Sequence, residues 1–132
     1  MSKKLQPRFI DNDDGTITDT TTRLMWTKET LACGPLEHTQ AIKACKSLRL
    51  ARRRDWRLPT IEELFSLVDH SQAFPAIDTA FFPDTHCLRY WACTLSRSNS
   101  LCGWVVDFKD GQAYITSLLH NCYVRAVRAP KP

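Results

Sequence analysis

The sequence lacks the features that mark several large functional classes. No run of about 18 apolar residues occurs, so no membrane-spanning helix is predicted. The segment 1–7 carries positive charge without an apolar stretch, so it does not resemble a secretory signal. The GxSxG, HExxH and glycine-rich phosphate-loop patterns are missing, as is any paired-acid motif. The sequence gives no support for these enzyme classes. The sequence leaves three cellular locations of the protein open: cytoplasmic, exported without a cleaved signal, or extracellular after removal of a leader.

A CxxC pair is also missing, although the chain has six cysteines, at positions 33, 45, 87, 93, 102 and 122. The missing pair argues against thioredoxin-like chemistry and against a zinc ribbon. An even number of cysteines in a chain of this size is typical of a disulfide framework in an oxidising compartment. Cys93 and Cys102, for example, flank a polar loop and are able to pair across it. The alternative is six reduced cysteines packed as small hydrophobic side chains, and the sequence leaves both open.

Charge is mild in sum but uneven along the chain. The length of 132 residues predicts a single domain, 1–132, and the net charge of +4 permits an anionic partner without requiring one. Seven basic residues fall within fifteen positions that contain one acid, Asp55. They are Lys43, Lys46, Arg49, Arg52, Arg53, Arg54 and Arg57.

Hydrophobic periodicity predicts an α+β domain with an antiparallel sheet, two helices and long loops. Strands are expected at 8–11, 16–19, 23–26, 90–94, 103–108, 112–117 and 122–128, and helices at 37–49 and 61–70. The first helix is expected to bury Ala41, Ile42, Cys45 and Leu48 and to expose Lys43, Lys46 and Arg49. Asp-Gly pairs at 14–15 and 110–111 predict two tight hairpin turns. The long connection 71–89 is rich in apolar residues, so we expect it to pack on the core.

The start of the second helix is the clearest local signal. Pro59 disfavours helical geometry at Leu58, and Thr60 with Glu63 forms a capping-box pattern. An apolar stripe follows at Ile61, Leu64, Phe65 and Val68.

Three blocks in order along the chain resemble the Lcl C-terminal domain family, named for bacterial collagen-like adhesins. They are RFIDNDDGTITDTTTRLMW, then DWRLPTIEELFSLVD, and finally YWACT, WVVDFKDG and YVRAVR. The resemblance implies a C-type-lectin-like fold whose terminal strands, near Phe9 and at 123–127, share a sheet. It also implies a homotrimer, for which the aromatic connection 74–82 is the only obvious apolar contact surface. In secreted relatives a cysteine at the place of Cys45 pairs with one in the last strand. Here Ala126 holds that second place, and Cys122, four residues earlier and on the same face of a regular strand, is a candidate substitute.

The basic cluster is the sharpest candidate site. Residues 51–58 fit the pattern X-B-B-B-X-X-B-X proposed for heparin binding, where B is a basic residue and X any other. One guanidinium group binds a sulfate or carboxylate through two parallel hydrogen bonds. We expect Arg52, Arg53 and Arg54 to bind a polyanion together with Arg49 and Lys46. The alternative is a solvated charged loop. Arg57 belongs to the family block, so its side chain is expected to be largely buried.

A second candidate surface lies in the late loop and strand region. It comprises Arg89, Tyr90, Trp91, Arg97, Ser98, Asn99, Trp104, Tyr114 and Tyr123. Aromatic side chains stack on sugars and short polar ones supply hydrogen bonds. Because Trp91 and Trp104 are expected in the core, Arg97 and Asn99 are the residues predicted to bind ligand.

Metal sites are disfavoured. The acidic run 11–15 fails the EF-hand register, since Gly15 as sixth residue would make Ile10 the first ligand, so a hairpin turn is the better interpretation. A zinc site of His86, Cys87, Cys93 and Cys102 has no standard spacing.

The sequence thus predicts a non-enzymatic module without cofactor or metal that binds an anionic polysaccharide, sulfated or acidic. Two alternatives remain. One is an enzyme related to formylglycine-generating proteins, whose fold is similar but whose cysteine motif has no counterpart here. The other is a nucleic-acid-associated intracellular or phage protein.

Overall fold

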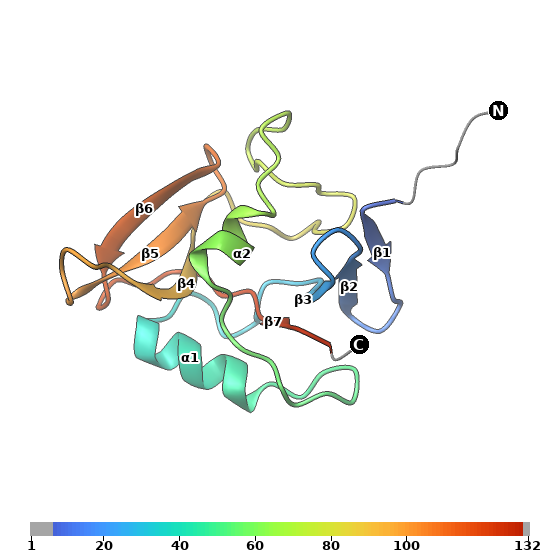
Figure 1. Cartoon of the computed structure of the whole chain (residues 1–132), viewed down its shortest axis with the longest axis horizontal. Helices are drawn as coiled ribbons and strands as arrows, with labels where there is room; N and C mark the ends of the chain where they lie inside the picture. The colour runs from blue at the N-terminus through green and yellow to red at the C-terminus, as the bar shows by residue number, and fades with distance from the viewer. Residues whose placement is uncertain (1–6, 131–132) are drawn as a thin grey trace.

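The computed structural model describes residues 7–130, which form two antiparallel sheets and two short helices (Figure 1). This arrangement confirms the α+β class, with two sheets in place of the single one expected. The strands are β1 (Phe9–Asp11), β2 (Thr16–Asp19), β3 (Leu24–Thr27), β4 (Arg89–Leu95), β5 (Cys102–Asp107), β6 (Gln112–Ser117) and β7 (Val127–Arg128). The helices are α1 (His38–Ser47) and α2 (Ile61–Phe65). Within 7–130 no helix is both long and apolar enough to cross a bilayer.

The first sheet joins the first three strands to the last one, in the order β1-β2-β3-β7. Met25 pairs with Arg128 and Trp26 with Val127, so the late strand lies beside β3 and not beside the strand at Phe9. The strand expected over 122–128 is shorter than predicted. Its first part makes only isolated bridges, Leu36 with Cys122 and Tyr90 with Tyr123. This segment therefore contacts the second sheet at Tyr123 and pairs with the first sheet at Val127 and Arg128.

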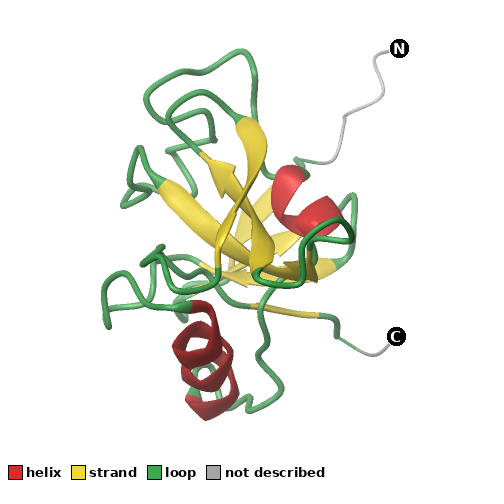
Figure 2. Cartoon of the chain, turned by 90° about the vertical axis from the view of Figure 1, so that its left-hand side faces the viewer, coloured by secondary structure: helices red, strands yellow, loops and turns green. Residues whose placement is uncertain are grey.

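The second sheet, in the order β4-β5-β6, has a helix on each face (Figure 2). Trp91 and Val105 point toward α1 and pack with Ala41 and Cys45. Tyr90, Ala92 and Val106 point the other way, into the core cluster that contains Leu64 of α2. The sheet therefore divides the interior into two hydrophobic clusters.

Helix α1 follows the prediction closely. Ala41 and Cys45 are buried and Ile42 and Leu48 are half-buried, while Lys43, Lys46 and Arg49 are exposed. His38, whose burial the sequence did not predict, lies edge-on to the Trp91 ring and contacts the Ala92 carbonyl through Nε2 at 3.0 Å.

Helix α2 starts as predicted but ends early. The Glu63 amide donates to Thr60 Oγ1 (3.1 Å), and the Thr60 amide donates to Glu63 Oε1 (2.9 Å), which confirms the capping box. The helix stops at Phe65, where the backbone tightens into i→i−3 bonds and the Ser66 hydroxyl donates to the Glu63 carbonyl. Phe65, expected on the buried stripe, is exposed, whereas Leu64 is fully buried.

The connection between α2 and β4 packs much of its apolar surface on the core, as expected. Ile77 and Phe82 are fully buried, whereas Phe74 is 69% exposed. The predicted trimer surface therefore loses most of its apolar residues to the core. Other apolar side chains, among them Leu101 and Leu119, are more exposed than Phe74, so this surface is not the only one available.

The two Asp-Gly hairpins exist, but both turns are wider than predicted. Asp11 pairs with Ile17, and Asp107 pairs with Gln112, which leaves more than two residues in each turn. Positive φ occurs at Asp13 and Gly15 in the first turn and at Gly111 in the second, and not at both members of either Asp-Gly pair.

All six cysteines are free thiols. Cys45 and Cys122 are buried in the same hydrophobic cluster, and burial raises the pKa of the Cys45 thiol to about 12 and that of Cys122 to about 11. The thiols are thus reduced, as in one of the two interpretations of the cysteine count, but only Cys45 and Cys122 are packed in the core. Cys33 and Cys93 are exposed, and Cys87 and Cys102 are half-buried.

Arg125 is a fully buried cation that the sequence did not single out. Its guanidinium donates to the carbonyls of Thr27 (2.8 Å) and Lys28 (2.6 Å) and to Thr85 Oγ1 (3.0 Å). Asp84 Oδ1 lies 3.4 Å away, and the Phe82 ring lies beneath the guanidinium. The side chain thereby holds the end of the long connection against β3.

Candidate functional site

The predicted polyanion-binding residues around α1 form an exposed group, which we call the basic ridge: Lys46, Arg49, Arg52, Arg53 and Arg54. All five are exposed. Lys46 lies in the last turn of α1, and the others follow on the segment that leads to Trp56. Arg49 Nη1 donates to the carbonyls of Lys46 and Leu48, both at 3.0 Å, so this residue is partly engaged at the end of the helix.

Arg52 lies at the tip of a tight turn. Leu50 and Arg53 exchange backbone hydrogen bonds of 3.3 and 2.9 Å, and the two residues between them, Ala51 and Arg52, have φ of 54° and 61°. This is the mirror-image hairpin turn that normally takes glycine or asparagine. An L-residue in this region costs about 1–2 kcal/mol. The fold therefore holds an arginine in a conformation that is unfavourable for it.

The only acid within the ridge segment is neutralised from outside it. Asp55 accepts two hydrogen bonds from Arg128, at 2.6 and 3.1 Å, and these lower the pKa of its carboxyl below the ordinary value. Within 7–130, Arg52, Arg53 and Arg54 make no ion pair. Three adjacent guanidinium groups are thus left to solvent.

Arg57 has the partner expected of a structural residue, but not the expected burial. It donates to both carboxylate oxygens of Glu63, at 2.8 and 2.9 Å. Burial alone would raise the pKa of Glu63, but the hydrogen bonds from Arg57 and the Thr60 amide outweigh it and the net pKa is lowered. The Arg57 side chain is 41% exposed, so the prediction that it is largely buried is wrong. Its partner lies on the first turn of α2, at the surface.

Arg97 and Asn99 do not join the ridge. Both are exposed in the loop between β4 and β5. In Figure 1 this loop lies at the left-hand end of the molecule, far from the turn that follows α1. Trp91 is fully buried as predicted, and Trp104 is partly buried against the core.

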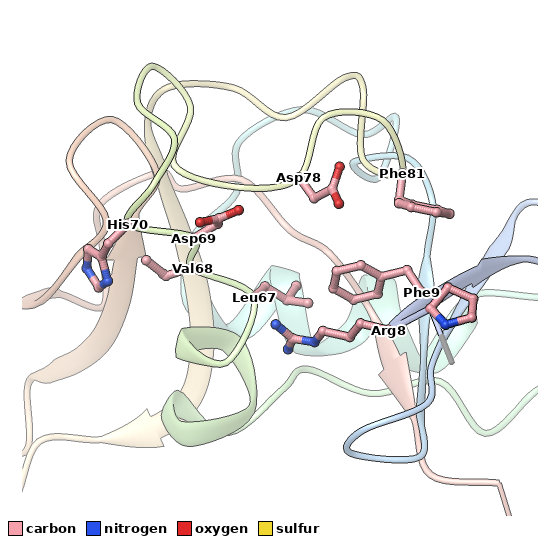
Figure 3. A pocket seen from close by; sticks show the side chains of 9 residues that line it. Arg8, Phe9, Leu67, Val68, Asp69, His70, Asp78 and Phe81 are labelled. Carbon is pink, nitrogen blue, oxygen red and sulfur yellow. The ribbon is translucent and has the colours of Figure 1, made fainter. Parts of the chain in front are cut away.

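A cavity of about 540 Å³ lies between β1 and the connection that follows α2 (Figure 3). Its one arginine, Arg8, already donates to Asp19 and, at 2.6 Å, to the Ser66 carbonyl. Two carboxylates, Asp69 and Asp78, also line it. This charge pattern disfavours an anionic ligand.

A second cavity, which we call the sheet pocket, has a volume of about 450 Å³. Its lining includes Arg89 and Tyr123 from the predicted late surface, together with residues that the sequence did not indicate. These are Pro35, Leu88, Asp107, Thr116, His120, Asn121 and Cys122. Side chains alternate between the two faces of a strand, and with the hairpin between β5 and β6 this alternation places Asp107 and Thr116 on one face of the sheet. The sequence carries no signal that Arg89 of β4 lies beside them.

The disfavoured metal sites are not assembled. Within the described residues no three His, Cys, Asp or Glu side chains form a group able to hold a metal ion. His86 instead stacks on the Tyr123 ring at 4.1 Å. In the acidic turn, Asp11 pairs with Lys28 (2.7 Å) and Asp14 accepts from Thr16, so these acids have partners within the chain.

The comparison with known proteins agrees with the three sequence blocks. No curated protein matches the chain. The profile of the Lcl C-terminal domain matches residues 15–128, which include β2 to β7, both helices and the basic ridge. The chain therefore belongs to the Lcl C-terminal domain family, and this membership implies an adhesin-like domain.

Proposed function

We propose that this protein is a non-enzymatic binding module of C-type-lectin-like fold, and that the basic ridge binds an anionic polysaccharide. The observation that carries the proposal is the set of three neighbouring arginines without ion pairs among the described residues, while Arg128 engages Asp55, the acid next to them in sequence. Guanidinium groups bind sulfate and carboxylate with two parallel hydrogen bonds, so consecutive arginines match the repeated charges of such a chain. The adhesin-like family supports the same function.

The ridge favours a polysaccharide over a single-stranded nucleic acid. Proteins that bind single strands combine a positive groove with aromatic side chains on which the bases stack. Trp56 is the aromatic residue nearest in sequence to the three arginines, but it is only 2% exposed and its indole donates to the Leu50 carbonyl. The ridge therefore offers charge from Arg52–Arg54 without a stacking surface from Trp56.

A homotrimer would strengthen this binding. Each ridge presents few charges, and repetition around a threefold axis multiplies the affinity for a long polymer through avidity. We infer a trimer from the family, with a contact that involves exposed apolar side chains such as Leu101 and Leu119. Light scattering is expected to give about three times 15.2 kDa. A monomeric mass would remove the avidity argument.

Heparin affinity chromatography tests the ridge. Changing Arg52, Arg53 and Arg54 together to Ala is expected to abolish retention while leaving Tm nearly unchanged, because their side chains are exposed. Salt should elute the wild type, since exposed charges are screened over about 8 Å at physiological ionic strength.

The matched control removes the same charge without altering the ridge, by changing Lys3, Lys4 and Lys109 to Ala. This control is expected to keep most of the retention. Equal loss in both triple variants would show that net charge, and not the ridge, causes the binding.

A further inference from the structure

We propose that the sheet pocket is a second binding site, and that it takes a single hexuronate unit with the sugar carboxylate on Arg89. This site differs from the basic ridge in residues and in chemistry. It does not depend on the ridge binding a polymer.

Strand register places the polar residues of the pocket on one face. Arg89 pairs with Asp107, Val105 with Tyr114, and Gly103 with Thr116. Paired residues share a face of the sheet, and so do residues two apart along a strand. Arg89, Asp107, Tyr114 and Thr116 are therefore on the same face as Trp91 and Val105, which are buried under α1.

Neighbouring side chains hold the Arg89 guanidinium in place but do not occupy its hydrogen-bond donors. Its guanidinium lies over the Tyr114 ring, 5.2 Å from the centroid, and the Tyr114 hydroxyl is itself held by Asp110 Oδ2 at 2.6 Å. Asp107 Oδ2 approaches Nε at 3.8 Å, which is beyond hydrogen-bond distance. No acceptor among the described residues takes a hydrogen bond from the Arg89 side chain, so its planar fork is free for a carboxylate.

The opposite wall comes from the turn after β6, which packs closely on the sheet at Gly103. A Cβ at Gly103 would lie 2.9 Å from Leu118 Cδ2, so a larger residue there would require the Leu118 side chain to move. His120 Nδ1 is bound to Thr116 Oγ1, which leaves Nε2 available. Asn121 is exposed and also lines the cavity. A sugar needs such donors and acceptors for its hydroxyls, and Leu88 and Pro35 supply apolar contact.

The charge pattern selects a carboxylate. One free guanidinium fork matches one planar, singly charged group. A phosphate dianion would place more negative charge near Asp107 and be repelled more strongly. A neutral sugar would leave the Arg89 fork bound only to water. Hexuronate combines the carboxylate with the ring hydroxyls that the other wall can bind.

Protein-observed NMR titration tests the site, with glucuronate and glucose as probes that differ at the carboxylate. Glucuronate is expected to produce saturable shifts around Arg89, His120 and Asn121, whereas glucose should bind at least about tenfold more weakly. Arg89→Gln should weaken glucuronate binding by at least about tenfold, because it removes the charged fork. Arg89→Lys keeps the charge without the fork, and we expect a similar loss.

The controls separate this site from the ridge. Lys109→Gln removes an exposed charge near the same hairpin and should leave glucuronate binding unchanged, as should the triple Ala change at 52–54. Three results would overturn the proposal: no saturable shift at millimolar glucuronate, equal binding of glucose, or wild-type affinity in folded Arg89→Gln and Arg89→Lys. Loss of binding in the ridge variant would assign the effect to the ridge.

Discussion

Replacement of Arg125 by Ala is expected to be among the most destabilising single changes in this chain. The side chain is fully buried and forms three hydrogen bonds of 3.0 Å or less, two of them to the carbonyls of Thr27 and Lys28. Alanine leaves those acceptors without their donor and leaves a cavity beside Phe82. Asp84 is 40% exposed, so its carboxylate can turn to water and adds little to the cost.

The size of the effect follows from these contacts. Removing one partner from a buried charged network costs about 3–5 kcal/mol, which is a large part of the roughly 5–15 kcal/mol that stabilises a typical domain. The Tm of a domain of this size should fall by on the order of 10–20 °C. Arg125→Lys should lose more than about 2 kcal/mol as well, because one ammonium group cannot replace the planar fork that reaches both carbonyls and Thr85.

Urea denaturation followed by far-UV circular dichroism measures the free energy of unfolding. Arg57→Ala is the matched control: this arginine makes a bidentate ion pair with Glu63, but its side chain is 41% exposed, so its loss should cost about 1 kcal/mol or less. If Arg125→Lys stayed within about 1 kcal/mol of the wild type, the planar fork would not be what makes Arg125 important. If Arg125→Ala cost no more than Arg57→Ala, burial would not be what makes Arg125 important.

Three further outcomes are expected. Ala51→Gly should raise the free energy of unfolding by about 0.5–1 kcal/mol in the same assay, because glycine relieves the cost of φ 54°; a loss of stability would show that the turn is not strained. Burial would raise the pKa of Asp19, but hydrogen bonds from Arg8 outweigh it and hold the folded-state pKa below the ordinary 3.8. Its stabilisation is therefore fully present above about pH 4 and is lost as the pH falls through the folded value, so Asp19→Asn should lower stability at pH 7 and flatten the acid limb of a pH–stability curve. Iodoacetamide should label Cys45 and Cys122 only after unfolding, since burial raises their pKa to about 12 and about 11; rapid labelling of either thiol in the native protein would contradict their burial.

Local signals in the sequence were sufficient where structure depends on near neighbours. The Thr60–Glu63 capping box starts α2 as predicted, because both of its hydrogen bonds lie within four residues. The exposed face of α1 follows from its helical period, which places Lys43 and Lys46 away from Ala41 and Cys45. The three exposed arginines at 52–54 follow from the same kind of evidence, since no apolar residue interrupts them.

Turns were less predictable, because the same residues permit several geometries. Asp110-Gly111 predicts a two-residue turn that would pair Lys109 with Gln112, whereas the structure pairs Asp107 with Gln112. The register moves by two, so each residue keeps its face but changes its partner. The tight mirror-image turn lies instead at Ala51-Arg52, where neither residue is glycine and the sequence carries no signal for it.

Sequence by itself determined the family, the α+β class and the exposed charge of the basic ridge, because each is carried by residues that are adjacent or regularly spaced. Tertiary structure alone decided which charges have partners. Asp55 is neutralised by Arg128, 73 positions away, and Arg125 is bound by carbonyls nearly 100 positions away. Arg89, at the start of β4, has Asp107 Oδ2 at 3.8 Å and the Tyr114 ring at 5.2 Å, but its side chain donates no hydrogen bond to a described residue. Charge pairing depends on distances between strands that are remote in sequence, and only the folded chain sets those distances.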